Sequence, residues 1–176
     1  GPDACDKQGV PDHVCEVNGD CNRIVEIWNN VFIQFNRLSA TEFQPLPKTH
    51  VDTGMGLERI VAVLQGVKGN YETDLLKPLL DETQRIAGQS DQERAKNLTA
   101  YRVIADHTRA ASFLIADGVI PGNVGRNYVC RMIIRRAARF ARTIGLKEPF
   151  MARVAKIVVE IYGQHYPELK REQELI

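Results

Sequence analysis

The chain has 176 residues, of which 44% are hydrophobic and 26% charged, and its formal net charge is +1. This composition is typical of a soluble globular protein with one ordinary domain or two small ones. The sequence contains no run of eighteen apolar residues and no signal peptide, so we expect a cytoplasmic protein without a membrane partner. Because the chain does not begin with methionine, we expect a fragment of a longer protein.

The four cysteines lie at positions 5, 15, 21 and 130. Zinc sites usually contain pairs of cysteines two to four residues apart, and none of these spacings fits. We therefore predict free thiols in a reducing compartment and no metal site. The histidines at positions 13, 50 and 165 are isolated in the sequence and indicate no ligand set.

The first half of the chain predicts irregular structure over the first twenty residues and then a strand from Arg23. Residues 25 to 35 alternate so that one strand face is almost wholly apolar, with Asn29 as its polar member, and we expect this face to line the core. Ser39–Glu42 is a plausible hairpin connection to the proline-containing segment 43–49.

Helical periodicity begins near Leu57, and a second helix is expected over residues 73–86. The polar segment 90–97 is the best candidate for a domain boundary, so we predict domains at 1–92 and 93–176. The second half predicts helices throughout, over 98–118, 128–145 and 149–162.

The segment from Pro121 to Lys156 carries nine lysines or arginines and a single acid, Glu148. Four arginines share one face of the predicted helix 128–145, and four apolar residues are expected on its opposite, buried face: Arg131, Arg135, Arg139 and Arg142, against Val129, Met132, Ile133 and Ala137. A solvated helix face is one interpretation. Nucleic acid is favoured, because no acids are interleaved and guanidinium groups bind phosphates in pairs of hydrogen bonds.

Two polar motifs beside this helix leave alternatives open. Asn123 and Asn127 either read base edges or serve as turn residues, and the residues alone favour the turn. Asp106, His107 and Arg109 are expected at a helix start, where a local salt bridge or cap is a better interpretation than a general base.

The segment Val51–Gln65, VDTGMGLERIVAVLQ, combines bare backbone with opposite charges. Gly54 and Gly56 allow a ligand to approach the backbone closely, Arg59 is suited to a phosphate, and Asp52 to a cation such as an amino group. The alternative is a glycine turn with a Glu58–Arg59 ion pair. A P-loop is excluded, because no GK[ST] follows.

The stretch LPKTHVDTGMGLERIVAVLQGVKGNYETDLL resembles motif 3 of the alanyl-tRNA synthetases, which are class II aminoacyl-tRNA synthetases. EIWNNVFIQFNR and YRVIADHTRAASFLIADGVIPGNVGRNYVCRMIIRRAAR resemble the same family in the same order, so the resemblance covers roughly residues 22–176. It implies an α+β, predominantly helical fold: the C-terminal part of a class II antiparallel sheet followed by a helical tRNA-recognition domain.

The resemblance also implies residue roles for the first domain. Arg59 would be the catalytic arginine that holds the ATP phosphates, with Gly56 beside the ATP. Alanine would lie against Asp52, which receives its ammonium group, and against Gly54, Asn29 and Val31.

For the helical domain, the resemblance implies that Asn123 reads the G·U pair of the tRNA(Ala) acceptor stem, and that the neighbouring arginines also contact tRNA: Arg126, Arg131, Arg135 and Arg139. Magnesium would accompany ATP, but its ligands cannot be placed. Zinc is expected only in the editing domain, which this chain lacks.

Departures from the family pattern limit these expectations. Motifs 1 and 2, the editing domain and the C-terminal domain are absent, so we expect the isolated chain to bind RNA without catalysing alanine activation. Ala4-Cys5 stand where the family often has Ser-Glu, and Asn127 replaces a commoner glycine. The alternative to a ligase part is a free-standing, non-catalytic RNA-binding module.

Overall fold

The computed structural model describes residues 5–16, 19, 21 and 23–176. The chain divides into two compact units, Gly1–Asn70 and Tyr71–Ile176, and a short 3-10 turn, η1 (Asn70–Glu72), crosses the division. The fold is α+β and predominantly helical, as predicted. The division by contacts falls earlier than the predicted 92/93 boundary, because the helix over residues 77–87 packs with the later helices.

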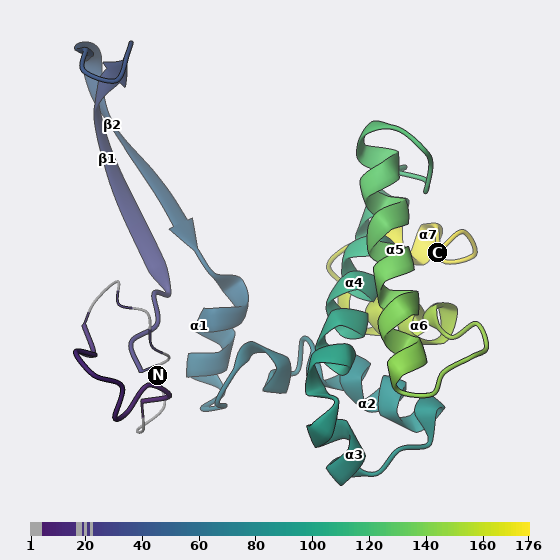
Figure 1. Cartoon of the computed structure of the whole chain (residues 1–176). Helices are drawn as coiled ribbons and strands as arrows, with labels where there is room; N and C mark the ends of the chain where they lie inside the picture. Colours follow the sequence, from purple (N-terminus) through teal and green to yellow (C-terminus); the bar gives the residue numbers. More distant parts are fainter. Residues whose placement is uncertain (1–4, 17–18, 20, 22) are drawn as a thin grey trace. The chain divides into compact units, whose positions relative to one another are not determined.

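The first unit is built on a hairpin of two long antiparallel strands, β1 (Trp28–Arg37) and β2 (Phe43–Met55), followed by helix α1 (Leu57–Leu64) (Figure 1). The predicted hairpin connection at 39–42 is confirmed, and the N–H of Leu38 donates to the Glu42 carbonyl at 3.0 Å. The register shifts between Ile33 and Phe35, so the two ends of the ribbon pair with different offsets.

The prediction that one face of the strand 25–35 lines the core is wrong for this structure. Val31 is 48% exposed and Ile33 37%, while Phe32 on the opposite face is 74% exposed. A sheet face becomes buried only when a second layer packs on it, and two strands alone supply none. The hairpin therefore shows apolar side chains on both faces.

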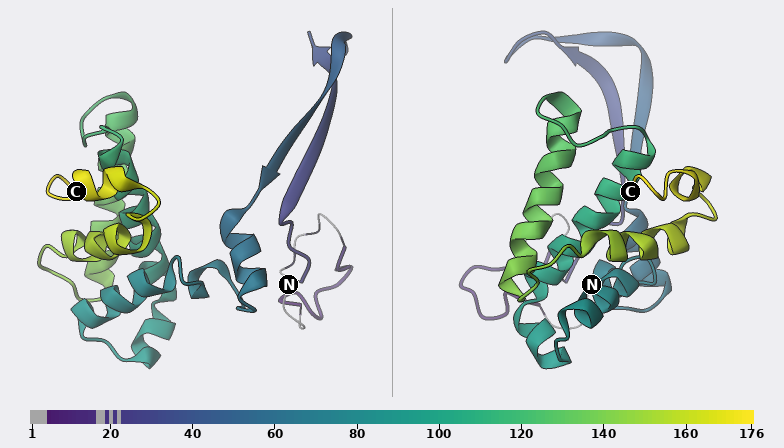
Figure 2. Two further views of the ribbon diagram at one scale, coloured as in Figure 1. Left: turned by 180° about the vertical axis from the view of Figure 1, so that it is seen from behind. Right: turned by 90° about the vertical axis from the view of Figure 1, so that its right-hand side faces the viewer.

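The second unit contains six helices: α2 (Lys77–Ala87), α3 (Asp91–Lys96), α4 (Leu98–Ala116), α5 (Gly125–Thr143), α6 (Met151–Tyr162) and α7 (Pro167–Arg171). Helix α4 is central: it packs along α5 and also contacts α2, α6 and α7 (Figures 1 and 2). Tyr101 and Ile104 of α4 are fully buried together with Leu79, Val154 and Leu169. Burial of such side chains stabilises the unit by roughly 1.5–3 kcal/mol each.

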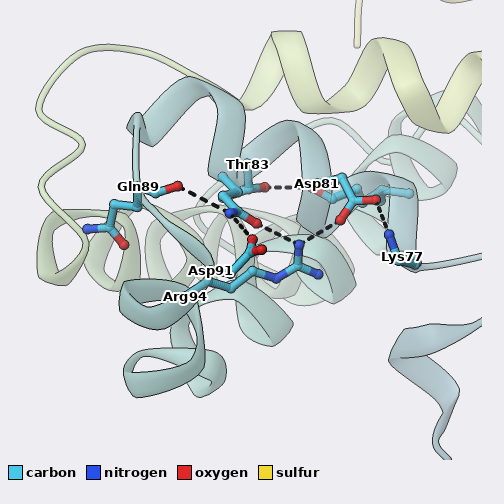
Figure 3. Close-up of polar contacts among 8 residues, drawn as sticks. Lys77, Asp81, Thr83, Gln89, Asp91 and Arg94 are labelled. Carbon is cyan, nitrogen blue, oxygen red and sulfur yellow. Dashed lines mark hydrogen bonds and ion pairs between the residues drawn. The ribbon is translucent and has the colours of Figure 1, made fainter.

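The segment 90–97, expected as a linker, forms helix α3 instead. Ser90 and Glu93 make a capping box, and Gly88 ends α2 in the left-handed conformation with φ of +64°. Figure 3 shows how polar groups join α2 and α3: Arg94 contacts Asp81 at 2.6 Å and Gln84 at 2.8 Å. The polar composition of this segment therefore reflects caps and interhelical hydrogen bonds.

None of the helices in the described part of the chain is both long and apolar enough to cross a membrane.

Candidate functional site

The strand register brings the four predicted alanine-contacting residues together. Asn29 lies directly opposite Gly54, and Val31 lies directly opposite Asp52. Residues paired in this way project from the same face of an antiparallel ribbon, and residues two apart on one strand share that face. One face of the hairpin therefore presents an amide, an apolar side chain, a carboxylate and bare backbone side by side. We call this set the hairpin face (Asn29, Val31, Asp52, Gly54).

Gly54 leaves the hairpin face open. A Cβ added at this residue would meet no atom within 4 Å, so the backbone there is accessible to a small ligand. Asp52 is exposed, and its carboxylate is available to a cationic group. On the other face, the indole N–H of Trp28 donates to the Thr53 hydroxyl at 2.5 Å, and this hydroxyl donates to the Asn29 carbonyl at 3.1 Å. These bonds tie the two strands together immediately behind the hairpin face.

The start of α1 holds Arg59 close to the beginning of β1. The guanidinium of Arg59 donates through Nη1 to the carbonyl of Glu26 at 2.5 Å, and the N–H of Gly56 donates to the Ile27 carbonyl at 3.0 Å. A Cβ at Gly56 would lie 3.1 Å from Cδ of Arg59, so this glycine lets the arginine side chain fold across the N-terminus of the helix. The exposed guanidinium is an anion-binding group attached to the hairpin.

The predicted tRNA-binding residues lie on α5 and on the loop before it. Arg126, Arg131, Arg135 and Arg139 are all exposed. Nη1 of Arg131 donates to the side-chain oxygen of Asn123 at 2.7 Å, so the structure joins these two predicted residues. Within the described ranges, no ion pair involves Arg135 or Arg139. Their guanidinium groups are therefore free of carboxylates.

Asn127 has a structural part in the loop. Its side-chain N–H donates to the Ile120 carbonyl at 2.6 Å, and its own carbonyl accepts from the N–H of Gly122 at 3.0 Å. A Cβ on Gly122 would lie 2.9 Å from Cβ of Asn127, so the loop closes tightly on this residue. For Asn127, the turn interpretation agrees with the structure.

The predicted buried face of this helix is wrong in phase. Val129 is 46% exposed and Met132 48%, whereas the helix packs through smaller side chains. The buried residues of α5 are Cys130, Ala137 and Ala141. Small side chains permit a close approach to α4, which is the main helical contact of α5. The arginine face remains exposed, with apolar side chains beside it.

Asp106 and His107 lie inside α4 and not at a helix start, which corrects the expected position. Nδ1 of His107 lies 2.9 Å from Oδ2 of Asp106, in agreement with a local contact. His107 is buried, and its Nε2 has no hydrogen-bond partner among the described residues. Arg109 donates to the hydroxyl of Tyr162 at 3.3 Å. These contacts hold α4 in its core and form no catalytic arrangement.

Sequence reasoning missed one group of metal-ligating side chains. Cys5, His13, Cys15 and Cys21 place their ligand atoms within 4.8 Å of one another. We call this group the Cys–His cluster. The backbone N–H of Arg23 is the largest influence on Cys21 and lowers the pKa of this thiol to about 7. Desolvation is the largest influence on Cys5 and raises the pKa of that thiol to about 11. The fourth cysteine, Cys130, is buried in α5, and all four thiols are free.

The comparisons with known proteins agree with the resemblance noted in the sequence. The family model described as tRNA synthetases class II (A) matches residues 3–176. Alanine–tRNA ligase of Desulfitobacterium hafniense is 47% identical over 168 residues, which are 96% of this chain and 19% of the relative.

Two further relatives are also alanine–tRNA ligases. The Chloroflexus aurantiacus enzyme is 52% identical over 160 residues, which are 91% of this chain and 18% of the relative. The Desulforamulus reducens enzyme is 46% identical over 172 residues, which are 98% of this chain and 20% of the relative. The chain thus spans about a fifth of the length of these curated relatives. Because the family model covers nearly every residue, this chain belongs to the class II (A) tRNA synthetases.

Proposed function

We propose that the chain is part of an alanine–tRNA ligase, which activates alanine with ATP and transfers it to tRNA(Ala). The observation that carries this proposal is the strand register, which pairs Asn29 with Gly54 and Val31 with Asp52. Alanine is a small zwitterion whose side chain is a single methyl group. The hairpin face offers a carboxylate for its ammonium group and an open backbone position for its small side chain.

In this proposal Asp52 orients alanine through a charge-assisted hydrogen bond to the ammonium group. Gly54 leaves room for the methyl group, and Val31 and Asn29 bound the space on the neighbouring strand. Discrimination by such a surface is limited, since one methyl or hydroxyl group is worth only about 1–3 kcal/mol. The face therefore selects against large amino acids far better than against glycine or serine.

Arg59 takes the role of an electrostatic clamp on the ATP phosphates. A guanidinium has five N–H donors, and the Glu26 carbonyl occupies one of the nitrogens of Arg59. The remaining donors are free to stabilise the charge that develops on the phosphates, and the fixed side chain costs little reorganisation. Gly56 contributes by leaving the Arg59 side chain space to fold over the helix start.

Class II synthetases in general use ATP together with magnesium, which neutralises phosphate charge. In the part of the chain that the structure describes, carboxylates do not gather in groups of three. We therefore assign no magnesium ligand and derive no step through the ion.

A chimeric enzyme tests the alanine site. This chain would replace the matching segment of the Desulfitobacterium hafniense ligase, and alanine-dependent ATP–pyrophosphate exchange would be measured. Asp52→Asn removes a hydrogen bond to a charged group, worth about 1.5–3 kcal/mol. The KM for alanine should then rise roughly 10- to 100-fold. Glu42→Gln, an equal loss of charge in the hairpin turn, serves as the control. Equal KM values for the two variants would contradict the role of Asp52.

The exposed arginines of α5 support RNA binding as the function of the second unit. The proposed partner is the acceptor stem of tRNA(Ala), with Asn123 reading the G·U pair beside Arg131. A free-standing RNA-binding module is the second candidate, since Arg135 and Arg139 are exposed and outside the ion pairs of the described residues. Both candidates require phosphate contacts by this helix face.

Salt titrations of tRNA binding test the α5 face. Replacing both Arg135 and Arg139 with alanine should weaken binding and reduce the slope of log K against log salt by about one unit per lost contact. The matched control replaces Lys147 and Lys156, exposed basic residues outside α5, with alanine. If the arginine pair changes the slope no more than the lysine pair, RNA binding by this face is refuted. A loss equal for tRNA(Ala) and an unrelated tRNA would favour the non-catalytic module.

A further inference from the structure

The Cys–His cluster has the dimensions of a tetrahedral metal site. A zinc ion with Zn–S of 2.3 Å and Zn–N of 2.0–2.1 Å separates its sulfur ligands by about 3.8 Å and a sulfur from a nitrogen by about 3.5 Å. In the structure, Nε2 of His13 lies 3.2 Å from Sγ of Cys5 and 3.6 Å from Sγ of Cys15. All four ligand atoms lie within 4.8 Å of one another. Shifts of about 1 Å would complete the coordination sphere.

The backbone brings these ligands together by turns and not by the short pairs of a zinc finger. Successive turns join the N–H of Gln8 to the Cys5 carbonyl at 3.2 Å and the N–H of His13 to the Val10 carbonyl at 3.3 Å. Gly9 and Asp12 adopt positive φ values of +87° and +60°, which reverse the chain between Cys5 and His13. Left-handed backbone at a residue other than glycine is uncommon, so the turn at Asp12 is a specific feature.

The choice of metal follows from the donor atoms. Three thiolates and one imidazole are a soft set, which suits zinc and excludes magnesium and calcium, since these ions require oxygen. We propose that Cys5, His13, Cys15 and Cys21 bind one Zn²⁺ ion as a closed structural site in the first unit. A site with four protein ligands leaves no position for water, so it stabilises structure and does not catalyse.

Two backbone amides support the thiolate form of the ligands. The N–H of Lys7 donates to Sγ of Cys5 at 3.3 Å, and the N–H of Arg23 donates to the thiol of Cys21. Each amide lies two residues after its cysteine, and each bond favours a negatively charged sulfur. A zinc ion with three thiolates has a net charge of −1. The side chains of Lys7 and Arg23 line the hollow beside the cluster, where their charges offset this excess.

Zinc would organise a segment that has little else to hold it. Among the described residues 5–16, 19 and 21, only Cys21 is buried, so no apolar core fixes the turns. In such a segment the free energy of metal binding becomes free energy of folding. The segment leads directly to Glu26 and Ile27, whose carbonyls accept from Arg59 and Gly56. The site therefore anchors the chain where it enters the hairpin.

The experiment uses the complete 176-residue chain, purified under reducing conditions. Elemental analysis should find one zinc per chain, and Co²⁺ substitution should give the thiolate charge-transfer and tetrahedral d–d bands. Cys5→Ser, His13→Asn, Cys15→Ser and Cys21→Ser should each weaken zinc affinity by more than about tenfold, since loss even of an outer partner costs 10- to 100-fold. Cys130→Ser is the matched control, because this thiol is buried outside the cluster.

A second measurement does not depend on purifying folded variants. Trypsin cleaves after Lys7 and Arg23, which lie beside the ligands. A chelator should accelerate cleavage at these two residues several-fold, while the helical circular dichroism of the second unit stays unchanged. Added Zn²⁺ should restore protection, and added Mg²⁺ should not.

Three results would overturn the proposal. One is a wild-type chain, reconstituted with zinc, that retains none after a weak chelator is added. Another is zinc affinity in the Cys5, Cys15 and Cys21 variants equal to that of the Cys130→Ser control. The third is a disulfide between two cluster cysteines in the reduced preparation. The proposal is independent of the alanine and tRNA assignments, and its failure would leave them intact.

Discussion

The two units of the molecule differ in where their apolar side chains lie. In the helical unit, Leu79, Tyr101 and Ile104 are completely buried, and the arginines of α5 are exposed. In the hairpin unit, Trp28 is 57% exposed and Phe32 74%. The helical unit thus encloses its own core, whereas the hairpin presents both apolar faces to its surroundings. Large exposed apolar areas of this kind mark surfaces that pack against other protein.

This contrast agrees with a chain that spans about a fifth of its relatives. The class II sheet requires further strands beside β1 and β2, and we propose that the longer ligase supplies them. The two proposed ligand surfaces follow the same division. The RNA surface lies on a helix of a complete unit, and the alanine surface lies on an incomplete sheet.

Core substitutions give the largest expected difference between the units. Ile104→Ala removes a fully buried side chain from α4 and should lower the free energy of unfolding by about 2–5 kcal/mol. Phe32→Ala on the exposed hairpin should change it by no more than about 0.5 kcal/mol. Urea unfolding followed by circular dichroism measures both values. Similar losses from the two substitutions would show that the hairpin has a core of its own.

A substitution on the hairpin face should separate function from stability. Gly54→Ala adds a methyl group where the structure has open space, so unfolding of the chain should change little. In the chimeric ligase the same methyl group would occupy the proposed alanine position. Overpacking of about 1–3 kcal/mol predicts a roughly 10- to 100-fold loss in kcat/KM for alanine activation.

Gly69→Ala is the control for this substitution, since a Cβ there also meets nothing within 4 Å and the residue lies outside the hairpin. Full alanine activation by the Gly54→Ala chimera would place the substrate elsewhere.

The smallest expected effect concerns acid stability of the helical unit. Burial by itself would raise the pKa of Asp81, but hydrogen bonds and charges from Lys77 and Arg94 lower it below its ordinary value. The folded-state pKa is thus below the unfolded value of about 3.9. The resulting stabilisation is present above this pH and is lost as the pH falls through the folded pKa.

Because Asp81 is 43% exposed, its contribution should stay below about 1 kcal/mol. Asp81→Asn should therefore slightly reduce stability at pH 7 and make unfolding between pH 5 and pH 2 less steep. Asp117→Asn, at an exposed carboxylate outside the network of Figure 3, is the comparison. Parallel pH profiles for the two variants would remove Asp81 from the account.

Periodicity in the sequence predicted the hairpin, α1 and the long helices, because apolar spacing and glycine stops are local signals. The phase of α5 was missed, since Val129 and Met132 are larger than the residues that pack. The helix buries Cys130, Ala137 and Ala141 because close packing on α4 favours small side chains. Burial depends on the neighbouring helix, and hydropathy alone does not describe that neighbour.

The candidate sites were predictable to different degrees. The residues of the hairpin face came from family resemblance, and only the strand register brings Asn29 opposite Gly54. The Cys–His cluster was missed because its ligands are separated by turns, with eight residues between Cys5 and His13 along the chain. Spacing rules for zinc describe short ligand pairs and do not detect a site closed by left-handed turns at Gly9 and Asp12.

Alanine-dependent pyrophosphate exchange by two proteins tests the central claim most directly. The isolated chain should show no exchange above background, because its sheet is incomplete. The chimera in which this chain replaces the matching segment of the Desulfitobacterium hafniense ligase should catalyse exchange with alanine and lose that activity on Arg59→Ala. Exchange by the isolated chain, or a folded chimera indifferent to Arg59→Ala, would contradict the account.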